Sequence, residues 1–480
     1  MTRYITQFVE FCAILLFCFY AGNAVGQANT KILYKDVLIK DVPHVQQKND
    51  FCGEACTEMY LRKLGYNYTQ DEIFNLSELD PMKGRGCYSG ELASALKNIG
   101  FDTGKIWFFI DANDSARQIE KQFQNMYDDL ANQIPSIVCM HYGDNPRASE
   151  HFRLVVGYDS KSDEIIYNEP ADSNAGYKKM QRGKFIELWP LKYEKEKWTL
   201  IRLRMKPNKI KEIDPAAGFT NADYAQHIMG LKKMIPNDSF TIVLQKPFVV
   251  IGDEPTETVK ERSIHTVKWA VDKLKQDYFK NDPRSIIDIW LFKDNKSYRK
   301  YSKEIFGDNP TTPFGYFSST HNALIMNIST GGGTLVHEIV HPFMAANFPD
   351  CPAWFNEGLA SLYEQSSERD GKIIGLTNWR LAGLQEKNRS GRLPSFEKLI
   401  NSTSGEFYGG SIYSDNYAQA RYLCYYLQEK NLLTKFYHQF TADAETDPSG
   451  FKTLQKILTN PNMQKFQKEW EQWVLKLSFP

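Results

Sequence analysis

Apolar positions in the second half of the chain predict a small sheet with helices packed against it. Continuous apolar runs indicate strands at 240–244, 248–251 and 285–292. Between the second and third runs, apolar residues recur every three or four positions, which predicts a helix with one buried face. The residues expected on that face are Ile264, Val267, Val271, Leu274 and Tyr278. Trp269 lies off this face and is expected to pack at its edge.

The first half, residues 31–205, mixes strand-like and helix-like patterns and predicts one α/β unit. An apolar run of helical period follows Cys52 and predicts a helix that begins there. Two further strands are indicated at 151–159 and 165–170. Residues 206–239 are rich in proline, asparagine and lysine, so we predict a linker or a small packing segment, with one short helix near 222–233.

One helical motif in the second half carries specific chemistry. Gly331–Gly333 interrupt the chain just before His337-Glu338-Ile-Val-His341. Residues four apart share a helix face, so His337 and His341 can direct their rings at one ion. Glu338 is then expected beside the open coordination position, where a carboxylate takes a proton from water. Pro342 removes the hydrogen bond to the Glu338 carbonyl and is expected to kink or end the helix.

A third ligand is expected on a following helix, and Glu357 is the candidate. Two histidines and one carboxylate, with the fourth position left to water, are a ligand set suited to catalytic zinc. The alternative is a surface helix that happens to carry two histidines. Only nine histidines occur in 480 residues, and apolar neighbours suit a buried helix, which favours the metal site.

Together with H-E-x-x-H, the stretch Trp354-Phe-Asn-Glu-Gly-Leu-Ala360 resembles the motifs of gluzincin metallopeptidases, the aminopeptidase N and thermolysin-like group. The resemblance implies a gluzincin domain over 240–480, with a small mixed sheet and a mainly helical C-terminal lobe. It implies zinc bound by His337, His341 and Glu357, with Glu338 as general base. Tyr417 matches the gluzincin tyrosine that stabilises the oxyanion, with Tyr413 as the alternative.

Two features distinguish this chain from the aminopeptidases of that group. Fifteen residues separate His341 from Glu357, fewer than in aminopeptidases, and the Gly-x-Met-Glu-Asn sequence that binds a free N-terminus is absent. An endopeptidase is therefore expected. By the same resemblance, strand 321–329 is expected to be the sheet edge that pairs with an extended substrate. His321 is expected to be a solvated loop histidine rather than a ligand.

A second candidate centre lies in the first half. At a helix N-terminus, the dipole and free amides are expected to lower the pKa of the Cys52 thiol. His151 opens one strand, and Asn168 and Glu169 end the next. A cysteine, a distant histidine and a third polar residue are the components of a thiol nucleophile with its base and orienting group.

This half resembles the papain-fold cysteine peptidases that remove double-glycine leader peptides. The matching pieces are Gln46-x5-Cys52-Gly53, Gly90-Glu-Leu92 with Gly100-Phe101, and the strand from His151 to Asp159. The resemblance implies that Gln46 helps form the oxyanion hole, Cys52 attacks, and His151 is the base. The family usually has Asp-Pro where this chain has Glu169-Pro170, so Glu169 is the orienting residue by position and Asn168 its chemical substitute.

Two other interpretations of this half stay open. Cys52 is either a packed thiol or half of a disulfide with Cys56 or Cys87. The domain is alternatively an inactive papain fold that binds peptides.

Composition and the N-terminus narrow the class of protein. Lysine plus arginine and aspartate plus glutamate both number 58, so no overall charge favours nucleic acid as a partner. Arg3, the apolar run 11–20 and Ala24-Val-Gly26 are typical of a signal peptide over residues 1–26. An uncleaved anchor, or less readily a lipid on Cys18, is the alternative. No later apolar stretch is long enough to predict a stable membrane span.

We therefore predict an α+β, extracytoplasmic (secreted or periplasmic) protein with a papain-like domain at 31–205, a linker at 206–239 and a gluzincin domain at 240–480. Its expected function is zinc-dependent hydrolysis of peptide or protein substrates, with the N-terminal domain as a second peptidase or a peptide-binding module. The alternatives are a cysteine peptidase as the main activity, or a non-catalytic peptide- or cell-wall-binding protein. Six cysteines follow the signal segment, which leaves one or two disulfides open.

Overall fold

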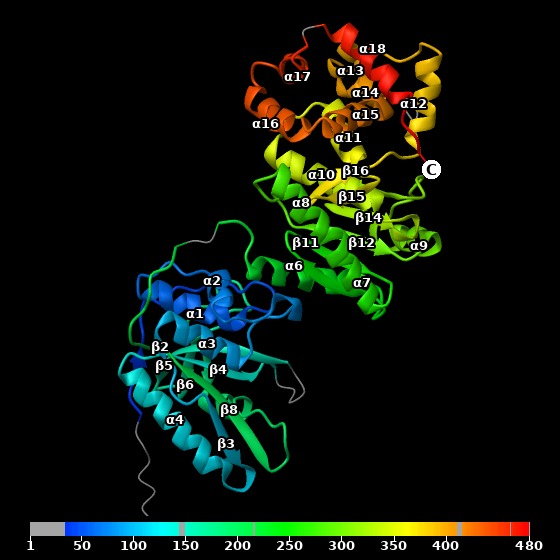
Figure 1. Cartoon of the computed structure of the whole chain (residues 1–480). Helices are drawn as coiled ribbons and strands as arrows, with labels where there is room; N and C mark the ends of the chain where they lie inside the picture. The colour runs from blue at the N-terminus through cyan, green and yellow to red at the C-terminus, as the bar shows by residue number, and fades with distance from the viewer. Residues whose placement is uncertain (1–33, 144–148, 215–216, 410–414, 461, 480) are drawn as a thin grey trace, which may run out of the picture.

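The computed structural model describes residues 34–143, 149–214, 217–409, 415–460 and 462–479. The expected signal peptide and Tyr413 lie outside these ranges. Figure 1 shows two lobes, with helix α6 (Asn221–Met234) between them. Within the described ranges, no helix is long and apolar enough to cross a membrane.

The N-terminal lobe is built on a seven-stranded antiparallel sheet. Its strands are β1 Val37–Leu38, β3 Trp107–Asp111, β4 Ser136–His141, β5 Glu150–Asp159, β6 Glu164–Asn168, β7 Lys178–Gln181 and β8 Lys197–Arg204, and a separate pair is β2 Phe101–Asp102 with β9 Lys206–Pro207. The helices are α1 Cys52–Lys63, α2 Gln70–Asn75, η1 Pro81–Lys83, α3 Ser89–Ile99, η2 Ala112–Asp114, α4 Ser115–Ala131 and α5 Arg182–Leu188. The strand order is β3-β8-β4-β5-β6-β7, and β1 pairs with β5. The predicted helix at Cys52 and both predicted strands are present.

The C-terminal lobe combines a mixed sheet with many helices. Its strands are β10 Thr241–Gln245, β11 Phe248–Gly252, β12 Ile287–Phe292, β13 Gly315–Ser318 and β14 Ala323–Asn327, with a hairpin of β15 Ser366–Arg369 and β16 Lys372–Gly375. Its helices are α7 Thr256–Arg262, the π-helical η3 Ser263–Lys268, α8 Trp269–Asp277, α9 Asn295–Phe306, η4 Ile328–Thr330, α10 Gly333–Asn347, α11 Ala353–Leu362, α12 Arg380–Arg389, α13 Phe396–Ile400, α14 Ser404–Tyr408, α15 Asp415–Glu429, α16 Leu433–Asp443, α17 Phe451–Leu458 and α18 Met463–Val474. The sheet order is β10-β11-β12-β14-β13.

Both faces of this five-stranded sheet are covered. Phe248 and Val250 of β11 face the core that contains α8 and α10, whereas Val249 and Ile251 face the core that contains α6 and α9. Strands β11, β12 and β14 pair in parallel, and parallel strands buried on both faces have continuous apolar runs. The small mixed sheet and the mainly helical C-terminal part agree with the expected α+β class.

Two local predictions are wrong, and one of the two outcomes expected at Pro342 is excluded. Ile264 is half exposed while Val267, Val271, Leu274 and Tyr278 are buried, because the π-helical turn η3 shifts the helical phase by one residue. Strand β14 is internal, and β13 forms the edge beside it. Pro342 does not end α10, which continues to Asn347, although proline donates no hydrogen bond to the Glu338 carbonyl.

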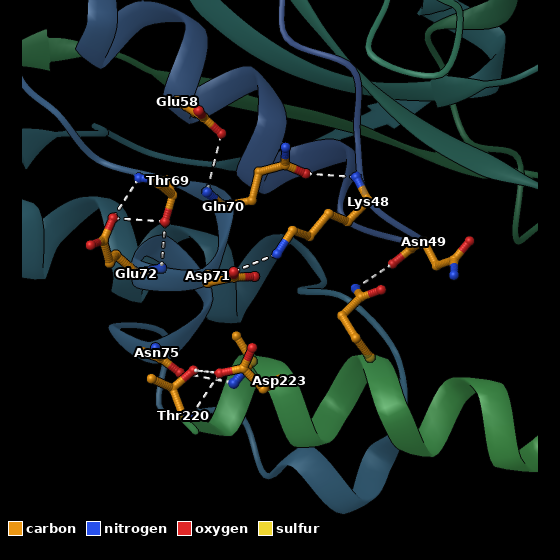
Figure 2. A network of polar contacts seen from close by, with 12 residues as sticks. Lys48, Asn49, Glu58, Thr69, Gln70, Asp71, Glu72, Asn75, Thr220 and Asp223 are labelled. Atoms are coloured by element: carbon orange, nitrogen blue, oxygen red, sulfur yellow. Dashed lines mark hydrogen bonds and ion pairs between the residues drawn. The ribbon is translucent and has the colours of Figure 1, made fainter. Parts of the chain in front are cut away.

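Helix α6 is the short helix expected near 222–233, and it packs on both lobes. Ala222, Ala225 and Met229 belong to the N-terminal core, and Tyr224, Ile228 and Leu231 belong to the core on the outer face of the C-terminal sheet. Figure 2 shows the polar contacts at the start of α6, where the Asn75 side chain accepts a hydrogen bond from the backbone N–H of Ala222 at 3.0 Å. Gln226 donates to the backbone oxygen of Asn49 at 2.8 Å. The helix therefore reaches the loop that leads into Cys52.

We predict that Gly333→Ala destabilises the C-terminal lobe. A Cβ at this first residue of α10 would lie 1.9 Å from the backbone oxygen of Glu364, so the helix must move. Overpacking of this kind costs about 1–3 kcal/mol, measured as a fall in the free energy of unfolding by chemical denaturation.

The matched control is Gly230→Ala in α6, where an added Cβ meets no atom within 4 Å. Replacing an exposed helical glycine by alanine should leave the free energy of unfolding unchanged or raise it by about 0.5–1 kcal/mol. Equal effects of the two substitutions would contradict the close approach of α10 to Glu364.

Candidate functional sites

Helices α10 and α11 bring the three expected metal ligands together. His337 and His341 lie one turn apart on α10, and α11 carries Glu357 to them. The Oε2 atom of Glu357 lies 3.3 Å from Nε2 of His337 and 3.9 Å from Nε2 of His341. One ligand atom from each side chain lies within 4.8 Å of the other two.

The polar atoms at this point fit a cation. Oε2 of Glu357 is buried and has no hydrogen-bond partner, while Oε1 accepts a hydrogen bond from the Tyr408 hydroxyl at 2.9 Å. An unpaired buried carboxylate oxygen is unfavourable unless a positive group meets it. Two imidazole nitrogens beside that oxygen make the set suitable for zinc, whose catalytic sites use two histidines and one glutamate.

A neighbouring side chain holds the ring of His341 by its second nitrogen, whereas the second nitrogen of His337 is buried without a hydrogen-bond partner among the described residues. Nδ1 of His341 lies 3.0 Å from Oδ1 of Asn356, and Nδ1 of His337 lies 3.5 Å from Oε1 of Glu364. Glu364 is itself held by Arg380 at 2.6 Å. A partner like Asn356 fixes ring orientation and leaves Nε2 to face a metal.

The electrostatics of the cluster favour positive charge. Burial opposes a charged imidazole, but the neighbouring carboxylate of Glu357 and the charges of Glu338 and Glu364 raise the pKa of His337 to about 9. Burial also opposes ionisation of Glu357, yet the adjacent ring of His337, the charge of His341 and the hydrogen bond from Tyr408 lower its pKa to about 2. At neutral pH a proton on His337 therefore supplies the positive charge that a bound cation would otherwise supply beside Glu357.

A cavity of about 690 Å³ opens onto these groups. Its lining from α10, α11, α14 and α15 includes His337, Glu338, His341, Asn356, Glu357, Tyr408 and Tyr417. Burial and the negative charge of Glu357 raise the pKa of Tyr417, so the phenol stays protonated. Among the described residues its hydroxyl has no hydrogen-bond partner, so the proton is free to point into the cavity.

The sequence did not indicate the partners that orient the ligands. Asn356 lies on α11 and Glu364 lies two residues after its end, and neither their spacing nor that of Tyr408 identifies them as neighbours of the ligands. The sequence feature that points to Tyr408 is the capping pair Thr403 and Glu406, which predicts the short helix α14 that ends at Tyr408. Each side chain of the pair accepts a hydrogen bond from the backbone N–H of the other residue. His321, expected in a loop, packs edge-on against Phe306 rather than joining the cluster.

In the N-terminal lobe, His151 and Glu169 form a buried pair. Nε2 of His151 lies 2.5 Å from Oε1 of Glu169, whose Oε2 accepts a hydrogen bond from Arg153 at 2.7 Å. Although burial alone would raise the pKa of Glu169, the hydrogen bond from His151 and the charges of His151 and Arg153 lower it to about 2. Asn168 bonds the backbone of Tyr177 instead, so Glu169 is the residue that orients the histidine ring.

Cys52 is the first residue of α1 and lines a separate cavity of about 610 Å³, which His151 does not line. The expected lowering of its pKa is wrong. Burial of the sulfur, with the charges of Glu54 and Asp50, outweighs the backbone hydrogen bond from Phe152 and raises the pKa of the thiol to about 12. Among the described residues no hydrogen bond joins the thiol to His151, whose ring packs edge-on against Tyr142.

The other residues expected at this centre have structural contacts. Gln46 is exposed, does not line the Cys52 cavity, and accepts a hydrogen bond on its backbone oxygen from Gln70 at 3.1 Å. Cys52, Cys56 and Cys87 are all free thiols, so neither of the two alternative disulfides is present.

Comparisons with known proteins bear mainly on the N-terminal lobe. Residues 39–196 match the Peptidase_C39 like family, and residues 332–448 match a family described as protein of unknown function (DUF1570). The chain is similar to the crystal structure of the peptidase domain of Streptococcus ComA, a bi-functional ABC transporter involved in a quorum sensing pathway. That match has 20% identity, covers 35% of this chain and 99% of the other, and has a TM-score of 0.24. No curated protein matches the chain.

The Glu169 pair gives a prediction for acid stability. Its carboxyl has a lower pKa in the folded protein than its ordinary value of 4.5, so its contribution is complete above about pH 4.5 and is lost as the pH falls towards 2. A shift of this size corresponds to roughly 3 kcal/mol of unfolding free energy. Denaturation curves at several pH values measure it.

Glu169→Gln is the comparison. The variant should be less stable at neutral pH, because Arg153 loses its buried partner, and the difference from the natural protein should shrink between pH 4.5 and 2. A difference that stays constant over this range would rule out the ionised pair.

Proposed function

Because residues 39–196 form a Peptidase_C39-like domain of papain type, we propose that the chain is a peptidase with two candidate centres. The family match supports the cysteine centre, and the geometry best supports the metal centre in the C-terminal lobe. The observation that carries the metal centre is the buried, unpaired Oε2 of Glu357 facing the Nε2 atoms of His337 and His341. The reaction is hydrolysis of peptide bonds.

In this proposal His337, His341 and Glu357 bind zinc. A zinc ion in this position would act as a Lewis acid and lower the pKa of a bound water. Glu338 lines the same cavity and accepts the proton of the attacking water, then delivers it to the leaving amine. Tyr417 donates a hydrogen bond to the oxygen of the scissile carbonyl as negative charge develops there. Tyr408 and Asn356 hold Glu357 and His341 in place by hydrogen bonds, and the charge of Glu364 lies near His337.

The cysteine centre is the second candidate. The family match and the His151–Glu169 pair support it, since a base and its orienting carboxylate are in contact. Activity requires Cys52 to lose a proton to His151, and the raised thiol pKa opposes that step in this structure. A peptide bound in the Cys52 cavity would have to bring the two side chains together. Without such a rearrangement the domain serves as a peptide-binding module.

An extracytoplasmic location and a polypeptide substrate complete the proposal. The signal-like sequence of residues 1–26 supports export. A non-catalytic protein that binds peptides or cell wall is the remaining alternative, and turnover separates it from the others.

Digestion of a mixed peptide library tests the two centres. We expect Glu338→Gln to lower kcat at least about 100-fold, because general-base catalysis contributes about 10²–10⁴-fold. Chelation should abolish the same cleavages, and thiol alkylation should leave them intact. The parallel variant is Cys52→Ala.

Each result has one interpretation. Loss of cleavage only in Cys52→Ala, with resistance to chelation, would replace the metal centre by the cysteine centre. Separate sets of products lost in each variant would establish two peptidases in one chain. No cleavage by the natural protein, with peptide binding retained, would favour a binding protein.

Zinc affinity should depend on pH. His337 has a pKa of about 9 in the metal-free protein, so below that pH a proton must leave when zinc binds. The apparent affinity should therefore rise about tenfold per pH unit between pH 7 and 9 and level off above 9. Competition with a coloured chelator measures the affinity without any assay of activity.

The control for this measurement is Glu357→Gln. It removes one ligand and the group that raises the His337 pKa, so affinity should fall and the pH slope should flatten. A natural protein with pH-independent zinc affinity would contradict the proposed ligand set.

A further inference from the structure

The wall of the metal cavity that is built by residues 283–287 carries a positive charge. Pro283, Arg284, Ser285 and Ile287 line the same 690 Å³ cavity as His337, Glu338 and Glu357. This segment leads into β12, the third strand of the five-stranded sheet. Arg284 is exposed, and it is the one lysine or arginine among the described residues that line this cavity.

No carboxylate in the described part of the chain neutralises Arg284. Among the described residues it forms no ion pair and no side-chain hydrogen bond. Its neighbour Asp282 is already paired with Lys275 at 2.5 Å. Of the acidic residues that line the cavity, Glu357 faces the two histidines, and Glu338 makes no ion pair with Arg284. A guanidinium that lines a cavity without a partner is suited to bind an anion.

Asn322 fixes the backbone and the hydroxyl beside Arg284. It lies in the turn between β13 and β14 with φ at 50°, a conformation that asparagine adopts readily. Its side-chain amide donates to the hydroxyl oxygen of Ser285 at 2.9 Å and to the backbone oxygen of Ile286 at 2.8 Å. Because the Ser285 oxygen accepts this bond, its own O–H is free to donate into the cavity.

We propose that Arg284 and Ser285 form a carboxylate-binding subsite of the metal cavity. The planar guanidinium supplies two parallel N–H donors to a carboxylate, and the serine hydroxyl supplies a third. The ligand is a substrate carboxylate close to the scissile bond. Two sources have this chemistry: the C-terminal carboxylate of a peptide, and the side chain of an aspartate or glutamate. The inference rests on the proposed peptidase function of the C-terminal lobe.

Binding of labelled peptides tests the subsite without turnover. Two pairs of fluorescein-labelled hexapeptides of one parent sequence are compared. In the first pair the side chains are neutral and the C-terminus is either a free carboxylate or an amide. In the second pair the C-terminus is an amide and one internal residue is either glutamate or glutamine. Fluorescence anisotropy measures their affinity for the full chain carrying Glu338→Gln and Cys52→Ala, loaded with zinc. The measurement is repeated with Arg284→Gln added, and with Arg389→Gln, an exposed arginine at the end of α12 outside the cavity.

Arg284→Gln should weaken binding of a carboxylate-bearing peptide about fivefold, the size of a partly exposed charge pair, and leave its uncharged counterpart unchanged. Zinc is present in both proteins, so any contact of the carboxylate with zinc cancels when the same peptide is compared with and without Arg284→Gln. The uncharged counterpart shows whether the loss depends on the carboxylate. A loss confined to the free C-terminus identifies a carboxypeptidase-type subsite. A loss confined to the glutamate peptide identifies selection of acidic side chains. Arg389→Gln should change neither.

Equal effects of Arg284→Gln on charged and uncharged peptides, or no effect on any, would overturn the subsite. Failure of the proposed function is a different result. If the proposed peptidase function is wrong, the protein with Glu338 intact does not hydrolyse the peptides, although their binding still depends on Arg284. Hydrolysis with no dependence on Arg284 would reject the subsite alone.

Discussion

The contact between α10 and α11 is the constraint on which the C-terminal site depends. It holds the unpaired carboxylate oxygen of Glu357 against two imidazole nitrogens, an arrangement that is unfavourable without a positive charge between them. Gly333 permits a close approach at the start of α10, where an added Cβ would lie 1.9 Å from the backbone oxygen of Glu364. Gly358 separately lets α11 lie against α15, where an added Cβ would lie 3.0 Å from the backbone oxygen of Ala420. Tight packing of the helices thus keeps these polar groups in an arrangement that is electrostatically unfavourable without a positive charge.

Much of the C-terminal site could be predicted from sequence because its chemistry is local. His337, Glu338 and His341 lie within two turns of one helix, so residue spacing alone places them on neighbouring faces. Glu357 required a resemblance to known zinc helices. Tyr408, Arg284 and Asn322 reach the cavity from three other elements, and only the tertiary fold brings such residues together. The edge position of β13 was missed for the same reason, since strand order depends on pairing between distant segments.

Predictions failed where one physical effect outweighed another. A helix N-terminus favours a thiolate, but enclosure of the Cys52 sulfur by apolar groups dominates and keeps the thiol protonated. Helical periodicity predicted burial of Ile264, but a π-helical turn changed the phase. The papain-like lobe therefore has the expected residues in the expected elements, while the ionisation state of its nucleophile follows from packing that the sequence pattern does not contain.

Helix α6 contributes one side of its surface to each hydrophobic core. Neither lobe can lose its structure completely without exposing apolar groups that belong to the other. Their unfolding equilibria are consequently linked, and any ligand that binds only one folded lobe raises the resistance of both to denaturation. A cation bound between His337, His341 and Glu357 would in this way protect the N-terminal lobe from proteolysis across a shared helix, without any change of shape at Cys52.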